Sequence, residues 1–277
     1  MKNKIKPFIC MVLSFFTMKA ISLLFHFILD VANIPFNNKT PMYQLLAGIC
    51  VFILTFIINF PLLKRDLKNW KNVKDKGKNI VLGIIIMFVI KYMIAFALAV
   101  VVLIIGGSVQ SENQSVIEQL AHANPWLSLL SGTLLAPFYE ELIYRGSMRE
   151  YFKNDILFII TSGLIFGLLH VVSNTIFLFA LLIFFATIEI FVDRKKNAFL
   201  NSVISLVVIM GLFFSLGFIN PKLIVLGIDF KSLMLQGSMY IVLGIYLAWY
   251  YVKNKNIYLN MIIHAGNNFI SELLVLF

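Results

Sequence analysis

The sequence predicts an all-α membrane protein, a polytopic bundle of about nine transmembrane helices, with eight as the alternative count. The first ground is composition: 60% of the 277 residues are hydrophobic, 13% are charged, and the mean hydropathy is +0.91. Such values lie far outside the range of soluble domains. The second ground is that apolar runs of roughly 20 residues, enough to cross a bilayer as a helix, recur along the chain.

The predicted spans follow one another along the chain, with boundaries soft by a few residues. The first apolar run follows a basic start, but it is too long for a signal peptide and has no obvious cleavage site, so we interpret it as a retained helix. The nine spans lie near residues 7–30, 42–63, 80–106, 126–150, 155–172, 175–193, 198–219, 234–252 and 257–276.

Charge alternates between successive connecting segments. The loop at 64–79 carries seven Lys or Arg residues, whereas the next segment holds Glu112 and Glu118 but no Lys or Arg. The basic start and the later basic clusters fall on the same predicted side of the membrane as the loop at 64–79. The positive-inside rule therefore places the N-terminus in the cytoplasm. We assign the net charge of +10 to topology and to anionic headgroups, and we exclude nucleic acid as a partner.

The fourth predicted span holds two adjacent carboxylates in an apolar helix. An ionisable group deep in a span costs some 2.5 kcal/mol or more, so it needs a partner, a water-filled cavity or a function. Glu141 and Arg145 are four residues apart and share a face, which predicts an ion pair. Glu140 points about 100° away and is the carboxylate expected to face a polar cavity. The alternative is an ion-pair cluster that only fixes helix packing.

Two later spans each carry a histidine. His170 follows Phe166 by four residues, and His264 precedes Asn268 by the same spacing, so each pair shares a helix face. A lone histidine in a helix is more often a hydrogen-bonded core residue. Counting about 1.5 Å per residue, however, places both histidines and Glu140 near the central plane of the bilayer. We therefore expect three helices to converge on one cavity.

These residue types are sufficient to hydrolyse an amide bond. Glu140 with His170 could take a proton from water, while His264 and Asn268 could donate hydrogen bonds to the oxyanion. Alternatively, Glu140, His170 and His264 could ligate Zn²⁺, which would acidify the water. A His-Glu-x-x-His signature is absent, which favours the mechanism without zinc; a zinc site would need ligands from separate helices.

The motifs resemble the CPBP family of intramembrane proteases, which includes CAAX prenyl endopeptidases and the bacteriocin-processing or immunity proteins of the Abi family. The family pattern is Glu-Glu-x-x-x-Arg, Phe-x-x-x-His and His-x-x-x-Asn, each on its own transmembrane helix. The matching residues are Glu140, Glu141 and Arg145; Phe166 and His170; His264 and Asn268. The resemblance implies four catalytic residues, Glu140, His170, His264 and Asn268, with Glu141, Arg145 and Phe166 in support. It also implies a glutamate-type or metallo-endopeptidase.

The resemblance suggests a division of the chain. It covers residues 126–277, which we predict to be the catalytic domain. Residues 1–125, with about three helices and the basic cytoplasmic loop 64–79, carry no motif. His170 and His264 are 94 positions apart, which is long for a bacterial member and indicates an inserted helix pair at about 175–219.

We expect an endopeptidase of a bacterial plasma membrane, whose partners are the lipid bilayer and a peptide or membrane-protein substrate. Abundant Lys, Asn, Ile and Phe is typical of an AT-rich genome, which favours a bacteriocin leader or peptide pheromone over a prenylated protein. One alternative is a non-proteolytic immunity or scaffold protein of the same fold. Another is a transporter, suggested by Lys19, Lys91 and Glu189 within spans. The oligomeric state is not predicted.

Overall fold

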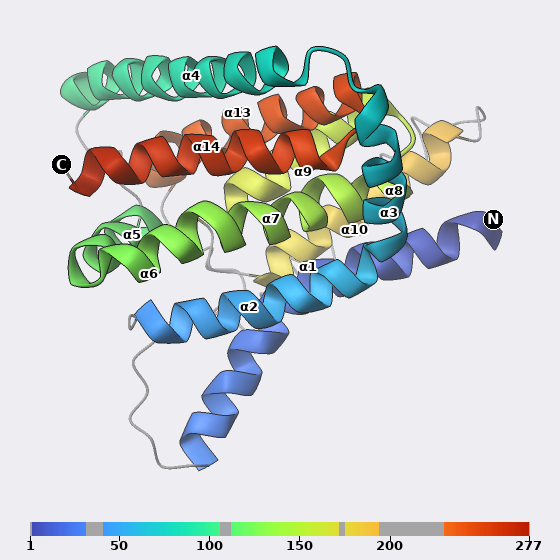
Figure 1. The fold of residues 1–277 in the computed structure, drawn as a ribbon, viewed down its shortest axis with the longest axis horizontal. Coiled ribbons are helices and arrows are strands. Elements are labelled where there is room, and N and C mark those ends of the chain that lie inside the picture. Colours follow the sequence, from blue (N-terminus) through green and yellow to red (C-terminus); the bar gives the residue numbers. More distant parts are fainter. Residues whose placement is uncertain (1, 32–40, 106–111, 172–174, 194–229, 277) are drawn as a thin grey trace. The chain divides into compact units, whose positions relative to one another are not determined.

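The computed structural model describes residues 2–31, 41–105, 112–171, 175–193 and 230–276 (Figure 1). Every regular element in these ranges is a helix and none is a strand, which confirms the predicted all-helical class. The chain forms two compact units. The first unit comprises Met1–Val89, Glu112–Tyr151 and Tyr250–Phe277, and the second comprises Ile90–Ser111 and Phe152–Trp249. The predicted division at residue 125 stays a prediction.

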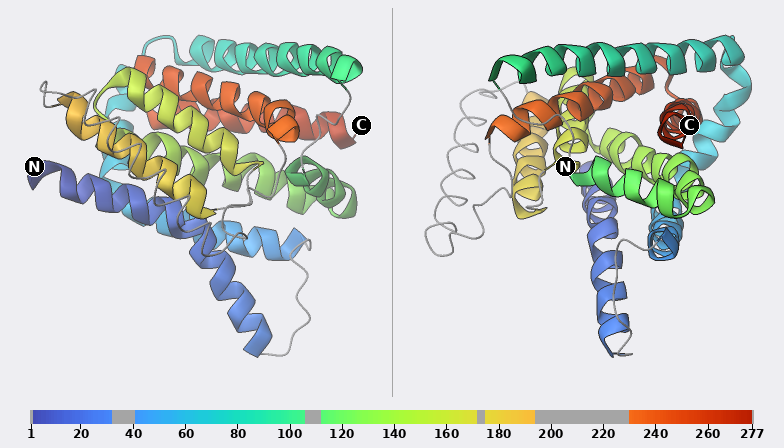
Figure 2. Two further views of the ribbon diagram at one scale, coloured as in Figure 1. Left: turned by 180° about the vertical axis from the view of Figure 1, so that it is seen from behind. Right: turned by 90° about the vertical axis from the view of Figure 1, so that its left-hand side faces the viewer.

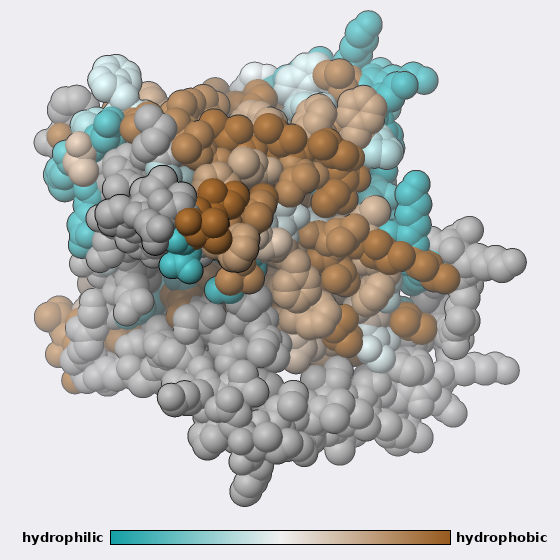
Figure 3. All heavy atoms as spheres, turned by 90° about the horizontal axis from the view of Figure 1, so that it is seen from below, coloured by the Kyte–Doolittle hydropathy of each residue, from teal (hydrophilic) through white to brown (hydrophobic). Residues whose placement is uncertain are grey.

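Among the described residues, two helices are long and apolar enough to cross a membrane, Lys4–Phe25 and Lys76–Ile104. A bent pair, Leu45–Ile58 with Phe60–Asn72, makes a third if it is one broken span. Large apolar side chains on these helices are exposed, and apolar side chains colour much of the face in Figure 3 brown. Exposure on this scale is expected of a surface that faces lipid. The count of nine spans and the cytoplasmic N-terminus stay predictions.

The seventh predicted span, 198–219, and most of the predicted insertion 175–219 lie outside the described residues.

The first unit includes one helix that the sequence did not predict, α5 (Glu112–Ala123). The first unit contains α1 (Lys2–Val31), α2 (Pro41–Ile58), α3 (Phe60–Asn69), η1 (Trp70–Asn72), the start of α4 (Lys76–Ile105), α5 (Glu112–Ala123), α6 (Pro125–Leu129), η2 (Leu130–Leu135), α7 (Ala136–Glu141), η3 (Leu142–Ser147), α8 (Met148–Tyr151), the end of α13 (Phe230–Asn254) and α14 (Ile257–Leu276).

The second predicted helix, 42–63, was wrong at its C-terminal end. Helix α2 stops at Ile58, and the chain turns by 75° before α3 begins. Pro61 stands at the start of α3, where its missing N–H is not needed and its fixed φ suits a new helix. The bend leaves α3 as a separate amphipathic helix with Leu62, Leu63 and Asp66 buried.

A small polar cluster joins the bend to α1 and η3. The Ser147 hydroxyl donates to Asn59 Oδ1 at 2.8 Å and lies 2.7 Å from the Ser14 hydroxyl. The Asn59 amide donates to the Thr55 carbonyl at 2.9 Å. All four side chains are buried, and such hydrogen bonds between helices stabilise packing in lipid. The cluster holds the N-terminal helices against the helix that carries Arg145, two residues before Ser147.

The fourth predicted span is a run of short helices from Pro125 to Tyr151, interrupted by two π-helical segments, η2 and η3. Pro137 cannot donate to a carbonyl one turn earlier, and η2 ends just before it, which accommodates the missing bond in a wider turn. π-Helical turns are frequent at functional sites. Here they flank α7, whose last two residues are Glu140 and Glu141, and α14 runs beside α7 and η2 (Figure 1).

The second unit contains α9 (Asp155–Leu169), α10 (Thr175–Asp193) and most of α13, and α9 and α10 lie side by side (Figure 2). Gly163 and Gly167 let α9 approach α13 closely. A Cβ atom on Gly163 would lie 2.8 Å from the backbone nitrogen of Ile245, so a larger residue would force the helices apart. Small residues spaced by four are typical of tight helix packing in membranes.

Glu189, one of the charges that suggested a transporter, has a structural partner. Its side chain is buried and accepts a 2.7 Å hydrogen bond from the backbone N–H of Lys153, in the turn before α9. The N–H of Asn154 lies 3.5 Å from the other carboxylate oxygen. This carboxylate therefore satisfies backbone donors at the start of α9.

Candidate functional site

Glu141 is the centre of a buried polar cluster in the first unit. The side chains of Glu141 and Arg145 have no exposed surface, and the Arg145 guanidinium donates to Glu141 Oε1 at 2.9 Å. The ion pair expected from their spacing is therefore present. The Asn260 amide of α14 donates to the other carboxylate oxygen at 3.2 Å. Two donors from different helices and a positive charge make burial of this carboxylate tolerable.

His264 lies between the two adjacent carboxylates. Its Nδ1 is 2.9 Å from Glu141 Oε1, and its Nε2 is 3.7 Å from Glu140 Oε2. Because Glu141 is ionised beside Arg145 and accepts, the proton of this contact is on Nδ1. The hydrogen bond fixes the ring so that Nε2 faces Glu140, whose side chain retains 12% exposure.

The polar face of α14 continues toward its C-terminal end. Asn260, His264, Asn268 and Glu272 follow at intervals of four residues, so they share one side of the helix. The Asn268 amide donates to the backbone carbonyl of Gly132 in η2 at 3.0 Å, and Ser128 of α6 donates to the buried Glu272 carboxylate. Polar contacts therefore join α14, along its length, to the run of short helices from Pro125 to Tyr151. These contacts fix how α14 is aligned with that run and so where His264 lies.

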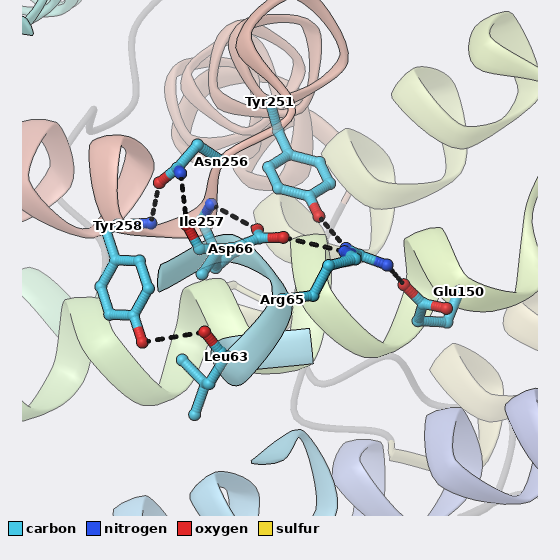
Figure 4. Close-up of polar contacts among 8 residues, drawn as sticks. All are labelled: Leu63, Arg65, Asp66, Glu150, Tyr251, Asn256, Ile257 and Tyr258. Carbon is cyan, nitrogen blue, oxygen red and sulfur yellow. Dashed lines mark hydrogen bonds and ion pairs between the residues drawn. The ribbon is translucent and has the colours of Figure 1, made fainter. Parts of the chain in front are cut away.

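The N-terminal end of α14 is capped by a carboxylate from α3 (Figure 4). Asp66, which is buried, accepts a 2.9 Å hydrogen bond from the backbone N–H of Ile257, the first residue of α14. Its own backbone carbonyl accepts from the Asn256 amide at 2.9 Å. Burial raises the pKa of the Asp66 carboxyl, while the Ile257 N–H and the charge of Arg65 act in the opposite direction. The first turn of α14 is thereby tied to α3.

Arg65 and Tyr258 extend this contact, as Figure 4 shows. The Arg65 guanidinium donates to Glu150 at 2.7 Å and, at 3.4 Å, to the Tyr251 hydroxyl. The Tyr258 hydroxyl donates to the Leu63 carbonyl at 3.2 Å. Helix α3 therefore contacts the segments on both sides of the turn that precedes α14.

His170 belongs to the second unit, at the C-terminal end of α9. Its Nδ1 lies 2.7 Å from the Phe166 carbonyl, which can only accept, so Nδ1 carries the proton of this contact. The ring stacks on Tyr240 of α13 at 4.5 Å and 12°, and it contacts the Phe166 ring at 4.7 Å. In the neutral ring Nε2 is then the acceptor. The convergence of His170 with Glu140 stays a prediction.

Four of the predicted site residues meet in the first unit: Glu140, Glu141, Arg145 and His264. Asn268 lies one turn beyond them on the same face and contacts Gly132. Asn260 was missed, although its place four residues before His264 put it on the same face. Glu272 was missed too, although it follows Asn268 by four residues. Asp66 and Ser128 were missed because only packing shows what these polar residues contact.

The described side chains that could ligate zinc do not lie close enough together to form a zinc site. Among the residues that the structure describes, no three His, Cys, Asp or Glu side chains gather closely enough to hold a metal. Near His264 stand two carboxylates, and one of them already binds Arg145 and Asn260. The zinc site predicted from Glu140, His170 and His264 stays a prediction.

Comparison with protein families gives one match. A family model described as type II CAAX prenyl endopeptidase, Rce1-like, matches residues 122–204 and 190–270, which together cover just over half of the chain. Comparisons with curated proteins and with solved structures gave no match. The three motifs lie inside the matched ranges, whereas Asp66 and Glu272 lie outside them.

Proposed function

Because the chain belongs to the Rce1-like type II CAAX prenyl endopeptidase family, we propose that it hydrolyses a peptide bond in a membrane-associated peptide or protein. The observation that supports this most is the His264 imidazole, which has one nitrogen at Glu141 and the other toward Glu140. An acid and an imidazole facing each other in a largely buried site are the groups that water activation requires.

Glu140 is the proposed general base. Glu141 is occupied by Arg145, His264 and Asn260, whereas Glu140 is partly exposed and 3.7 Å from His264 Nε2. That separation is longer than a direct hydrogen bond, and one water molecule beside the two groups can contact both. Glu140 takes a proton from the water as its oxygen attacks the scissile carbonyl carbon. The same proton then passes to the leaving amine nitrogen when the C–N bond breaks.

His264 and Asn268 are the proposed donors to the oxyanion. With Nδ1 bonded to Glu141, a second proton on Nε2 would give His264 a donor on the side of Glu140. The Asn268 amide carries two hydrogens, and the contact with Gly132 uses one of them. A preorganised donor of this kind contributes roughly 10²- to 10³-fold in rate.

The roles of the remaining motif residues follow from the resemblance and their contacts. Following the resemblance alone, we propose that His170 shares the water with Glu140. Glu141 and Arg145 are positioning residues that hold His264. None of these steps requires a metal ion. For the substrate we favour a bacteriocin leader or peptide pheromone in a bacterial plasma membrane, as the composition suggests.

The test is a comparison of membrane peptidomes from cells that express wild-type protein, Glu140→Gln or Asp75→Asn. Asp75 is an exposed acid outside the site, so its amide variant controls for expression and charge. We expect one or a few peptides to be cut with wild type and Asp75→Asn and to stay intact with Glu140→Gln. If the three peptidomes are the same and Glu140→Gln keeps a protective or signalling phenotype, the protein acts without proteolysis and the proposal fails.

A further inference from the structure

Helix α3 and the turn after it present a basic surface that the hydrolytic proposal does not use. Lys64 and Lys68 of α3 and Lys71 of η1 are exposed and spaced by four and three residues, which places them on the side opposite the buried residues of α3. Phe60 and Leu67 are 52% and 59% exposed on this same side. We call these five residues the basic face.

The bend before α3 determines how this face lies. Helix α3 turns by 75° from α2, which is apolar over its length. If α2 crosses the bilayer, α3 therefore runs nearly along the membrane surface. A helix with lysines and exposed apolar side chains on its outer side is the pattern of an interfacial helix, whose apolar residues insert between headgroups.

The charge around the basic face is mainly positive. Residues 64–78 contain seven Lys or Arg and two Asp, and one of these acids, Asp66, is buried against Ile257 and Arg65. The exposed side is thus strongly positive. We propose that the basic face binds the anionic headgroups of phospholipids. The apolar Phe60 and Leu67 among the lysines favour a lipid surface over an acidic protein.

The opposite side of α3 contacts α14. Asp66 accepts from Ile257 N–H, and the Leu63 carbonyl accepts from Tyr258, about two helical turns before His264. Anionic lipid held at the basic face would therefore also steady the first turn of α14. This inference concerns lipid binding and does not depend on the proteolytic proposal.

The binding test is native mass spectrometry of the full chain in detergent, titrated with phosphatidylglycerol or phosphatidylcholine. Each lysine near an anionic surface strengthens binding about fivefold. We expect wild type to bind phosphatidylglycerol at least tenfold more tightly than phosphatidylcholine. The triple variant Lys64→Gln, Lys68→Gln, Lys71→Gln should lose most of that preference. The control triple Lys6→Gln, Lys153→Gln, Lys253→Gln removes the same charge from exposed lysines elsewhere and should keep it.

Equal loss in both triple variants would show that total charge rather than the basic face attracts the lipid, which overturns the proposal. Equal binding of the two lipids by wild type, or preferential binding of an acidic peptide, also overturns it. Hydrogen exchange in nanodiscs tests the link to α14 without any substrate. Amides at 257–260 should exchange more slowly with phosphatidylglycerol than with phosphatidylcholine, and Asp66→Asn should abolish the difference. Cleavage without this lipid effect would refute only the inference about α3.

Discussion

Glu140→Gln is expected to lower kcat for peptide hydrolysis by about 10²- to 10⁴-fold in protein reconstituted into vesicles. The amide keeps the size of the side chain but cannot accept the proton of the attacking water. Since the one ion-pair contact that Glu140 makes among the described residues is the 3.7 Å approach to His264, the change should leave KM and the thermal unfolding temperature close to wild type. The measurement is the cleavage rate of a quenched fluorescent peptide built on the sequence cut in cells.

Two variants control this prediction. Glu140→Asp retains a carboxylate, moved back by one methylene, and should keep more activity than Glu140→Gln. Asp75→Asn should cleave at the wild-type rate, because Asp75 is an exposed residue outside the site. A Glu140→Gln protein that is folded and cleaves within about threefold of wild type would remove Glu140 from the mechanism.

Glu141→Ala is expected to destabilise the protein by about 3–5 kcal/mol, the usual result of removing one partner of a buried ion pair. It would leave the fully buried Arg145 guanidinium without its 2.9 Å carboxylate partner and would deprive His264 and Asn260 of their acceptor. Unfolding in mixed detergent micelles, followed by circular dichroism, measures the change. Activity should also fall, because His264 loses the hydrogen bond that orients its ring.

The double variant Glu141→Ala, Arg145→Met separates the charge effect from the packing effect. Removing the stranded charge should recover part of the lost stability, since an apolar pair can replace a buried ion pair at little cost. It should not recover activity, because the acceptor for His264 Nδ1 is still missing. A double variant less stable than Glu141→Ala alone would mean that Arg145 is held mainly by other groups.

The helical class and the main site pairing could be predicted because each depends on local rules. Apolar length and composition predict helices, and a spacing of four residues predicts that Glu141 and Arg145 meet. The bend at Asn59 was not predicted, because the apolar run continues to Leu63 and hides the helix end that Pro61 marks. The π-helical segments around α7 leave no periodicity signal, since each adds only a local widening.

The partners of the site residues were harder to predict than the site residues themselves. Nothing local in the sequence indicates that Glu141 rather than Glu140 bonds His264 Nδ1, because that choice depends on how α14 packs against α7. The capping of α14 by Asp66 joins residues 191 positions apart, and such a contact leaves no trace in local spacing. Asn260 and Glu272 are exceptions, because their intervals of four from His264 and Asn268 were visible.

The most direct test of the proposed mechanism compares three proteins in the same vesicles with the same peptide: Glu140→Gln, His264→Ala and the double variant. Glu140 faces His264 Nε2, and residues that act as a unit are strongly non-additive in their effects on rate. We predict that each single variant loses at least about 10²-fold in kcat and that the double variant is about as slow as the slower single variant. If the two losses multiply in the double variant, or if His264→Ala cleaves at the wild-type rate, then Glu140 and His264 do not form one catalytic unit.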